Sequence, residues 1–275
     1  MIKKIYFFND KKQKLRGFVH TPKYKNKNKS KKSSRASKLN NAAQHETAII
    51  FLHGFPSCCY GSTAKRAARD FSKRSYLVMM FDFSGTNKSE GKFEDKLISQ
   101  EVREIRYAID FLEKEFGFKK LVLVGHSTGG IDAALYAHKD KRISKLILFG
   151  ASGNLKESVK YEFTQLQIRQ FWIKGFITYK QEGKWFHNKK MKKKYYDEFF
   201  KLDVLKSLSK FRKPVLIVHG SDDEAVPAEV DAKDLYKAAR MPKKLLIVNG
   251  ADHRFSRKMH WDRFVREADR FIQKG

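Results

Sequence analysis

The chain has 275 residues, of which 41% are hydrophobic, and it carries a formal net charge of +29. Its length predicts one or two domains with a sizeable core, and its apolar content is too high for a disordered chain. No run of about 18 apolar residues occurs and no signal peptide is evident, which excludes membrane-spanning classes. The two cysteines, Cys58 and Cys59, are neighbours and form neither a disulfide framework nor metal-ligand spacing. We therefore expect a cytoplasmic protein with free thiols and no metal.

Two stretches carry most of the excess positive charge. Residues 11–45 contain twelve Lys or Arg and no Asp or Glu, and residues 156–213 contain sixteen basic and six acidic side chains. An anionic partner such as RNA, a membrane surface or an acidic polymer would explain this charge. A lysine-rich composition displayed on solvated faces would explain it equally, and we favour it because no nucleic-acid-binding motif is present. We expect weak, non-specific binding to anionic surfaces and no specific nucleic-acid partner.

The first segments predict a hairpin and a long polar loop. Residues 2–8 and 15–20 are strand-like runs joined by a turn at residues 9–10. Residues 22–46 are rich in Lys, Asn and Ser and contain almost no large apolar residue, which predicts a solvated, mobile loop. The next predicted elements are a strand at 47–52, a helix at 64–73 and a strand at 76–81.

The rest of the chain repeats a strand–helix pattern. Between residues 98 and 116 apolar side chains recur at steps of three and four, which predicts one long amphipathic helix. Further apolar runs and helical patterns predict strands at 120–124, 145–150, 214–218 and 244–248, and helices at 131–137 and 259–272. Strands that alternate with helices are typical of the α/β class, with a mostly parallel central sheet covered by helices on both faces.

The pattern changes between residues 152 and 206, where aromatic residues crowd between lysines and no clean strand is evident. We interpret this segment as a mainly helical cap, which leaves residues 1–151 and 207–275 as the core. More than half of its aromatic side chains should form the cap's own small core, and the others should line a substrate pocket. The candidates for that pocket are Phe171, Trp172, Phe176, Tyr179 and Trp185.

The sequence Gly125-His126-Ser127-Thr128-Gly129 stands between a predicted strand and a predicted helix. A G-x-S-x-G sequence in this context is typical of a nucleophile elbow, a sharp turn that exposes its serine. Side chains at the two glycine positions would collide with the neighbouring strand and helix. The helix N-terminus also offers free N–H groups and a positive dipole end to a developing oxyanion. Ser127 is therefore the candidate nucleophile.

Two later strands are each followed by titratable side chains. Asp222 and Asp223 follow one predicted strand, and His253 follows the next. Loops at the carboxyl edge of a parallel sheet commonly carry functional residues, and the chain order Ser, Asp, His is the one expected for this kind of elbow. His253 is favoured by its position, whereas His260 lies on the last predicted helix and is expected at the surface. Both aspartates remain candidates for the partner of the histidine.

From Thr47 to its end the chain resembles the α/β-hydrolase superfamily. The resemblance rests on five motifs in order, namely His53-Gly54-Phe55, Phe81-Asp82-Phe83-x-Gly85 through Gly91-Lys92-Phe93-Glu94, Gly125-His126-Ser127-x-Gly129-Gly130, His219-Gly220-x-Asp222-Asp223 and Gly250-Ala251-Asp252-His253. The second and fifth motifs are similar to those of bacterial cinnamoyl/feruloyl esterases, serine hydrolases with a helical cap. Asn87 stands where that branch usually has a second glycine, and the lysine-rich segment before Thr47 is longer than usual.

The resemblance implies a role for each site residue. Ser127 would be the nucleophile, His253 the general base, and Asp223 rather than Asp222 the acid that orients the histidine. The backbone N–H groups of Phe55 and Thr128 would form the oxyanion hole. No metal or other cofactor is implied.

The function expected from these residues is hydrolysis of a carboxylic ester with an aromatic or otherwise bulky apolar acyl group. A monoacylglycerol lipase-like or thioesterase activity is the alternative within the superfamily, because the same three residues serve all of these reactions. A peptidase acting at free N-termini is less favoured, since the cap shows no acidic cluster to hold an amine. A non-catalytic hydrolase-fold module that binds an anionic partner is the alternative from a different class.

Overall fold

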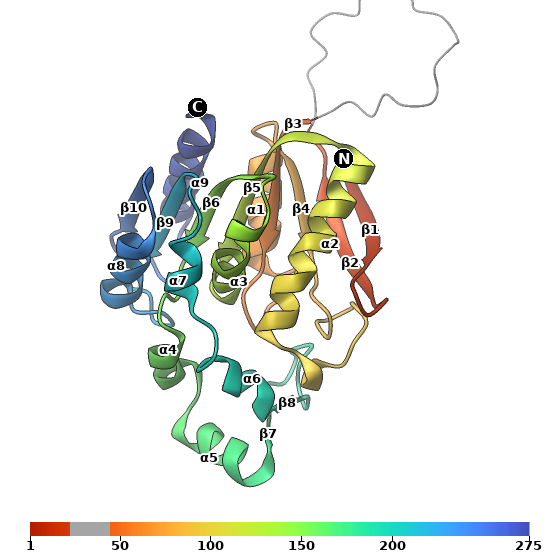
Figure 1. The fold of residues 1–275 in the computed structure, drawn as a ribbon, viewed down its shortest axis with the longest axis vertical. Helices are drawn as coiled ribbons and strands as arrows, with labels where there is room; N and C mark the ends of the chain where they lie inside the picture. Colours follow the sequence, from red (N-terminus) through yellow and green to blue (C-terminus); the bar gives the residue numbers. More distant parts are fainter. Residues whose placement is uncertain (23–44, 275) are drawn as a thin grey trace, which may run out of the picture.

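The computed structural model describes residues 1–22 and 45–274. Their main feature is an eight-stranded sheet in the order β1-β2-β4-β3-β5-β6-β9-β10 (Figure 1). All pairs from β4 to β10 are parallel, while β2 runs antiparallel to both β1 and β4. The strands are β1 (Ile2–Phe8), β2 (Lys14–His20), β3 (His45–Leu52), β4 (Leu77–Phe81), β5 (Phe118–His126), β6 (Ile143–Phe149), β9 (Val215–Gly220) and β10 (Lys243–Val248). The predicted basic loop at 22–46 lies, apart from its ends, outside the described residues.

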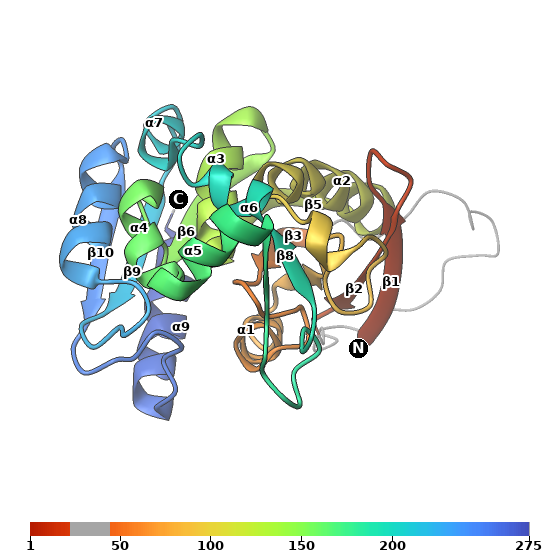
Figure 2. The same ribbon diagram turned by 90° about the horizontal axis from the view of Figure 1, so that it is seen from below.

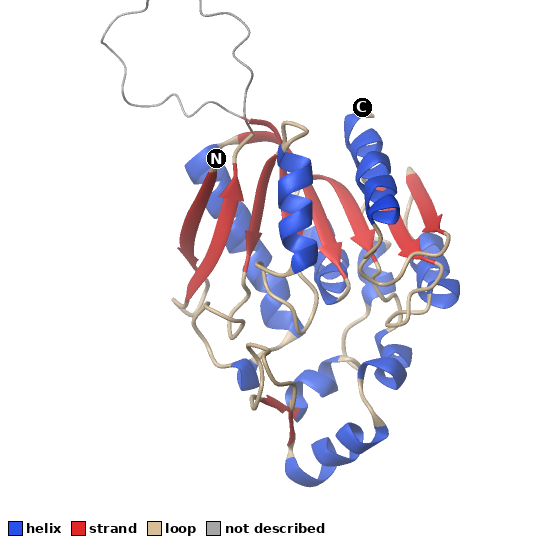
Figure 3. Cartoon of the chain, turned by 180° about the vertical axis from the view of Figure 1, so that it is seen from behind, coloured by secondary structure: helices blue, strands red, loops and turns tan. Residues whose placement is uncertain are grey.

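Helices cover both faces of this sheet, which confirms the predicted fold class. Two helices lie on one face, α1 (Ser62–Ser72) and α9 (Lys258–Gln273) (Figure 3). On the opposite face lie α2 (Ile98–Phe116), α3 (Thr128–Tyr136), α7 (Val204–Leu208) and α8 (Ala228–Ala238) (Figure 1). Two short 3₁₀ turns, η1 (Phe93–Asp95) and η2 (Ala137–Lys139), complete the core. No helix in the described part of the chain is long and apolar enough to cross a lipid bilayer.

The central strands contain continuous apolar runs because each faces a hydrophobic layer on both sides. In β3, Ile50 and Leu52 belong to the layer under α2 and α3, whereas Ile49 and Phe51 belong to the layer under α1 and α9. This alternation follows from the two-residue repeat of a strand. The sheet is therefore held from both sides, and its carboxyl edge is fixed enough to position loops.

The long helix α2 confirms its predicted apolar face. Ile98, Ile105 and Leu112 are fully buried, and the helix ends at Gly117, whose φ is 65°. The prediction that His260 is a surface residue is wrong, because that side of α9 packs on the sheet and leaves His260 6% exposed.

A further set of elements lies beyond the carboxyl edge of the sheet (Figure 2), the edge toward which the arrowheads of the parallel strands point (Figure 3). It comprises α4 (Leu155–Glu162), α5 (Gln165–Lys174), β7 (Phe176–Thr178), β8 (Lys190–Lys192) and α6 (Lys193–Glu198). The paired strands β7 and β8 differ from the expectation of a segment without strands. Each has only three residues, which is too short to give an alternating pattern in the sequence.

Candidate active site

Ser127 occupies the sharp turn between β5 and α3. Its φ of 56° and ψ of −125° are unusual for a residue with a side chain. The turn is also crowded, since a Cβ atom on Gly125 would lie 2.1 Å from the carbonyl oxygen of Gly129. A Cβ atom on Gly129 would lie 2.5 Å from the carbonyl oxygen of Leu52. The two glycines of the motif are therefore required by close backbone approach, as the sequence predicted.

Near this turn, two backbone N–H groups have no acceptor in the described part of the chain. Thr128 is the first residue of α3, so its N–H has no acceptor within the helix. The N–H of Phe55, in the loop after β3, donates to no acceptor among the described residues. Gly54 brings that loop against the serine, because a Cβ atom on Gly54 would lie 2.7 Å from Cβ of Ser127. These are the two groups that the sequence singled out for an oxyanion hole.

The loops after β9 and β10 bring Asp223 and His253 together. Nδ1 of His253 lies 2.9 Å from each carboxylate oxygen of Asp223, whose side chain is wholly buried. The N–H groups of Ala225 and Val226 donate to the same carboxylate at 3.0 and 2.8 Å. Nε2 of His219 lies 3.3 Å from it on another side. The Asp223 carboxylate is thus held in one orientation toward His253.

The charge state of Asp223 follows from these contacts. Burial alone raises its pKa, but the hydrogen bonds from His219, His253 and the Val226 N–H outweigh burial and hold the pKa of Asp223 well below its usual range. The carboxylate is therefore ionised at neutral pH and favours a proton on Nδ1 of His253. Such a proton leaves Nε2 of the neutral ring free to accept another.

Asp222, the other candidate, lies apart from the histidine. Its carboxylate accepts a hydrogen bond from Oγ of Ser221 at 2.7 Å, and its backbone N–H donates to the carbonyl of Ala251. Among the described residues no contact joins the Asp222 side chain to His253. The side chain is exposed, and the geometry therefore pairs His253 with Asp223.

Ser127 and His253 line one cavity of about 400 Å³. Phe55 and Gly54 border it from the core, and Trp185 and Phe186 border it from the loop between β7 and β8. No hydrogen bond between Ser127 and His253 is present among the described residues. Such catalytic hydrogen bonds are often long until a substrate is bound. The shared cavity wall is the observation that links the two side chains.

The five aromatic candidates occupy different places. Trp185 alone among them lines the cavity, while Tyr179 packs its ring on Phe55 at 5.8 Å. Phe171 is fully buried against Phe163 and does not border the cavity. Trp172 is 68% exposed. Phe176 is half-buried, with Nζ of Lys190 4.3 Å from its ring centre.

Further lining residues lacked any signal in the sequence. The cavity wall also includes Phe186, Gln181, Lys184 and Arg254. Arg254 could have been suspected because it directly follows His253. The other three residues belong to the loop between β7 and β8, which carries no motif that would place this loop over a serine.

His126 packs against His253. Its ring lies 4.8 Å from the ring of His253, and its Nε2 is 3.1 Å from the His253 carbonyl oxygen. Burial, followed by the charge of His253, lowers the pKa of His126 to about 3. His126 is therefore neutral and serves as packing. In the described part of the chain no group of three or more His, Cys, Asp or Glu side chains is placed to hold a metal ion.

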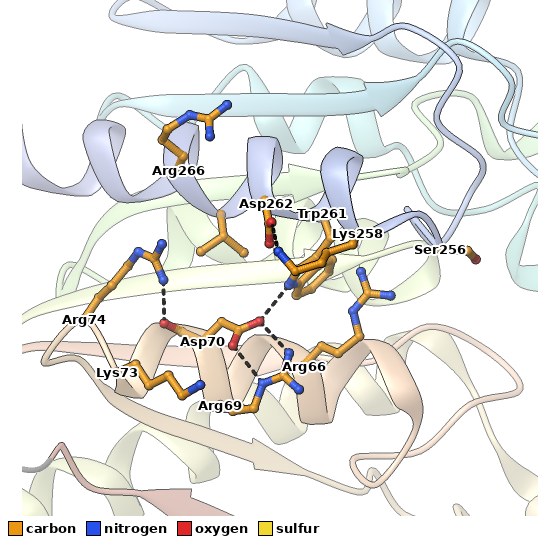
Figure 4. A pocket seen from close by; sticks show the side chains of 11 residues that line it. Arg66, Arg69, Asp70, Lys73, Arg74, Ser256, Lys258, Trp261, Asp262 and Arg266 are labelled. Atoms are coloured by element: carbon orange, nitrogen blue, oxygen red, sulfur yellow. Dashed lines mark hydrogen bonds and ion pairs between the residues drawn. The ribbon is translucent and has the colours of Figure 1, made fainter.

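A larger hollow of about 750 Å³ lies between α1 and α9, on the face of the sheet that these two helices cover. Figure 4 shows Asp70 at its centre, where the carboxylate accepts hydrogen bonds from Arg69 and from Nε1 of Trp261 at 2.9 Å. The guanidinium of Arg66 lies 4.0 Å from the centre of the Trp261 ring. None of the predicted site residues lines this hollow. Its polar groups join the two helices to each other.

Residues 43–198 match the family described as serine aminopeptidase, S33. The chain belongs to this family of α/β hydrolases. The match covers more than half of the chain and includes the elbow at Ser127. It confirms the predicted α/β-hydrolase resemblance.

Curated relatives are distant but cover most of the chain. A bifunctional esterase/perhydrolase from Acinetobacter calcoaceticus is 26% identical over 74% of this chain and 84% of its own length. A mitochondrial palmitoyl-protein thioesterase from Bos taurus is 24% identical over 82% of this chain and 73% of its own. The relatives thus support hydrolase or esterase activity and include more than one kind of ester.

Solved structures show the same fold. Est1E from Butyrivibrio proteoclasticus, determined with ferulic acid bound, is similar with a TM-score of 0.78 and 24% identity, over 98% of this chain and 97% of that one. A putative hydrolase from Agrobacterium vitis has a TM-score of 0.75 and 19% identity over 99% of both chains. Because these identities are low, the likeness is one of fold.

Proposed function

We propose that this chain is a serine-dependent carboxylic-ester hydrolase that works through an acyl-enzyme. One observation carries the proposal: Ser127, on a strained turn at a helix N-terminus, shares a cavity with His253, whose other ring nitrogen is paired with the buried Asp223. This arrangement supplies a nucleophile, a base and an orienting acid in one place.

In the proposed reaction, Oγ of Ser127 attacks the ester carbonyl while Nε2 of His253 takes its proton. Asp223 stabilises the resulting imidazolium, and the N–H groups of Phe55 and Thr128 stabilise the oxyanion. His253 then gives the proton to the leaving alcohol as the carbon–oxygen bond of the ester breaks. Water, deprotonated by His253, releases the acid from Ser127.

We propose that the acyl group is aromatic or otherwise bulky and apolar. The rings of Phe55, Trp185 and Phe186 border the cavity and can bury such a group. In this proposal residues 152–206 are a cap that sets substrate choice, and the core residues perform the chemistry. The structural likeness to an esterase with bound ferulic acid supports this preference at the level of the fold.

A thioesterase or lipase-like activity is the second candidate, favoured by the similarity to a palmitoyl-protein thioesterase. The same three side chains would serve a thioester. The aminopeptidase activity in the family description would need a negative charge to hold a substrate amine. No Asp or Glu is found among the described residues that line the cavity, and this favours esters over peptides.

A substrate panel tests the proposal. It contains p-nitrophenyl esters of two to sixteen acyl carbons, methyl ferulate and a palmitoyl thioester, assayed with the purified full-length chain. We expect the highest kcat/KM for methyl ferulate or a medium-chain ester. A clear preference for the palmitoyl thioester would favour the second candidate. Hydrolysis of none of these compounds would reject the ester-hydrolase proposal.

A further inference from the structure

The cavity that contains Ser127 has two positive side chains in its wall. Lys184 borders it from the loop between β7 and β8, and Arg254 borders it from the loop after β10. The other polar side chains in the wall, apart from Ser127 and His253 themselves, are neutral and belong to Ser57, Ser62, Thr63, Gln181, Cys58 and His126. Among the described residues that line the cavity, the side chains of Lys184 and Arg254 are thus cationic and none is an acid.

Neither cation is engaged by an acid. No ion pair or side-chain hydrogen bond is formed by Lys184 or Arg254 among the described residues. Other lysines near the insertion do form them, as Lys192 does with Asp95 at 2.6 Å. Lys184 and Arg254 are thus free to bind a group outside the protein.

The acids near the two cations do not border the cavity among the described residues. Asp252, two residues before Arg254, accepts a hydrogen bond from the backbone N–H of Ser256. Asp223 is buried behind His253 and is already held by several hydrogen-bond donors. Glu224 accepts a hydrogen bond from the backbone N–H of His253 at 3.1 Å. Glu182, in the same loop as Lys184, does not border the cavity. An anion entering the cavity would meet two cations without displacing a carboxylate.

The two cations reach the cavity from different parts of the fold, one from the core and one from the loop above it. Arg254 directly follows His253, so their Cα atoms are about 3.8 Å apart. Lys184 directly precedes Trp185, which supplies part of the apolar wall. A substrate that fills this space therefore has both a place for an apolar group and a place for a negative charge.

We propose that Arg254 and Lys184 form an anion subsite, and that the preferred substrates are esters carrying a carboxylate or phosphate group. The inference rests on the proposed ester hydrolysis at Ser127 and adds a substrate class to it. Arg254 can hold a carboxylate or phosphate through two parallel N–H bonds, and Lys184 adds a mobile positive charge. The subsite sets specificity and takes no part in bond breaking.

Three acetate esters of similar shape test the subsite: 4-acetoxybenzoate, 4-acetoxybenzamide and 4-acetoxyphenyl-trimethylammonium. The kcat/KM of each ester is divided by the rate constant for hydrolysis of the same ester by hydroxide. This removes differences in leaving-group reactivity among the three esters. At low salt we expect the anionic ester to exceed the neutral amide by at least about tenfold, and the cationic ester to be the poorest. The advantage of the anion should shrink in about 0.5 M salt.

Variants assign the effect to the two side chains. Arg254→Gln and Lys184→Gln should each lower the anion-to-neutral ratio by about fivefold, as expected for the loss of one charge near the surface. Arg254→Lys keeps the charge but loses the paired N–H bonds, so its ratio should lie between those of the parent and Arg254→Gln, which a purely structural effect would not produce. The matched controls are Arg257→Gln and Lys174→Gln, exposed cations that do not border the cavity, and they should keep the ratio within about twofold.

The outcomes separate this inference from the function on which it rests. If the parent hydrolyses the neutral ester but shows no anion preference, the subsite is rejected and the ester hydrolase stands. A preference that persists unchanged in both Gln variants also rejects it. If none of the three esters is hydrolysed, the proposed function fails and the subsite fails with it.

Discussion

At the scale of single residues, the polar centre of the site is formed by Ser127, His253 and Asp223, with the buried Asp223 carboxylate 2.9 Å from Nδ1 of His253. Ser127 and His253 were favoured by a motif and by their positions after strands, and the structure places them on one cavity. The choice of Asp223 over Asp222 needed resemblance, because spacing alone left both open. Lys184 could not be predicted, since only tertiary packing brings the loop between β7 and β8 to the cavity of the serine, whereas Arg254 could have been suspected as the neighbour of His253.

Replacing each aspartate separately tests the pairing with His253. Asp223→Asn should lower kcat by about 10⁴-fold, because the histidine loses the charge that orients it. Asp222→Asn is the matched control and should change kcat by less than about threefold, since its side chain does not contact His253. Steady-state kinetics on one p-nitrophenyl ester measures both. Larger loss in Asp222→Asn than in Asp223→Asn would contradict the assignment.

Because of Glu162, at the end of α4, we expect the stability of the protein to depend on pH. Burial raises the pKa of Glu162 to about 7, and no hydrogen-bond donor among the described residues offsets the burial. In the unfolded chain this carboxyl has its ordinary pKa of 4.5. Between that pH and about 7 the unfolded chain releases a proton that the folded chain keeps, so the free energy of unfolding falls as pH rises through this range. Glu162→Gln should therefore increase the free energy of unfolding by about 2 kcal/mol at about pH 8 and leave it nearly unchanged at about pH 4.

Urea titrations of the parent and of Glu162→Gln at both pH values measure this difference. Glu157→Gln, an exposed change on the same helix, is the control and should show no such pH dependence. Equal stability of Glu162→Gln and parent at about pH 8 would show that Glu162 is solvated.

At the scale of elements, periodicity succeeded where an element is long and failed where it is short. The 19 residues of α2, about five turns, repeat an apolar face often enough to define it, whereas β7 and β8 have three residues each. The helix α8 was not predicted, because its sequence shows no clear apolar stripe. It is buried by packing against β9 and α7. The insertion's own core was expected, and Phe163, Phe171 and Tyr196 pack there in mutual ring contacts.

Two tryptophans of the insertion allow a matched test of its role. Trp185 borders the cavity, whereas Trp172 is exposed on α5 and does not. Trp185→Ala should lower the ratio of kcat/KM for methyl ferulate to that for p-nitrophenyl acetate by about tenfold, because an aromatic acyl group loses a packing partner. Trp172→Ala should leave the ratio unchanged. Equal ratios in the parent and both variants would show that the loop between β7 and β8 does not determine substrate choice.

At the scale of the whole molecule, the charge of +29 is the property that the fold explains least. Most of the excess lies in residues 11–45 and 156–213. Elsewhere in the described residues several lysines are matched by acids, such as Lys119 by Glu46 and Lys244 by Glu267. Much of the lysine-rich segment at 22–46 lies outside the described residues. The expectation of a solvated basic surface without a specific partner stays a prediction.

Salt dependence tests that prediction. The intact chain should bind single-stranded RNA or anionic vesicles weakly at about 20 mM salt, and the binding should vanish near about 150 mM, because it arises from counterion release alone. A variant with residues 23–38 deleted should bind less and hydrolyse small esters at the parent's rate. Fluorescence anisotropy measures the binding. Tight, salt-resistant and sequence-selective binding would instead indicate a nucleic-acid function.

The turnover of Ser127→Ala on a p-nitrophenyl ester tests whether Ser127 is the nucleophile of an ester hydrolase. The reacting oxygen is removed while the strained turn, the cavity and the Asp223–His253 pair are kept. A loss of about 10⁶-fold in kcat, equivalent to about 8 kcal/mol of activation free energy, is expected with an unchanged circular dichroism spectrum. Activity within tenfold of the parent's would contradict the account.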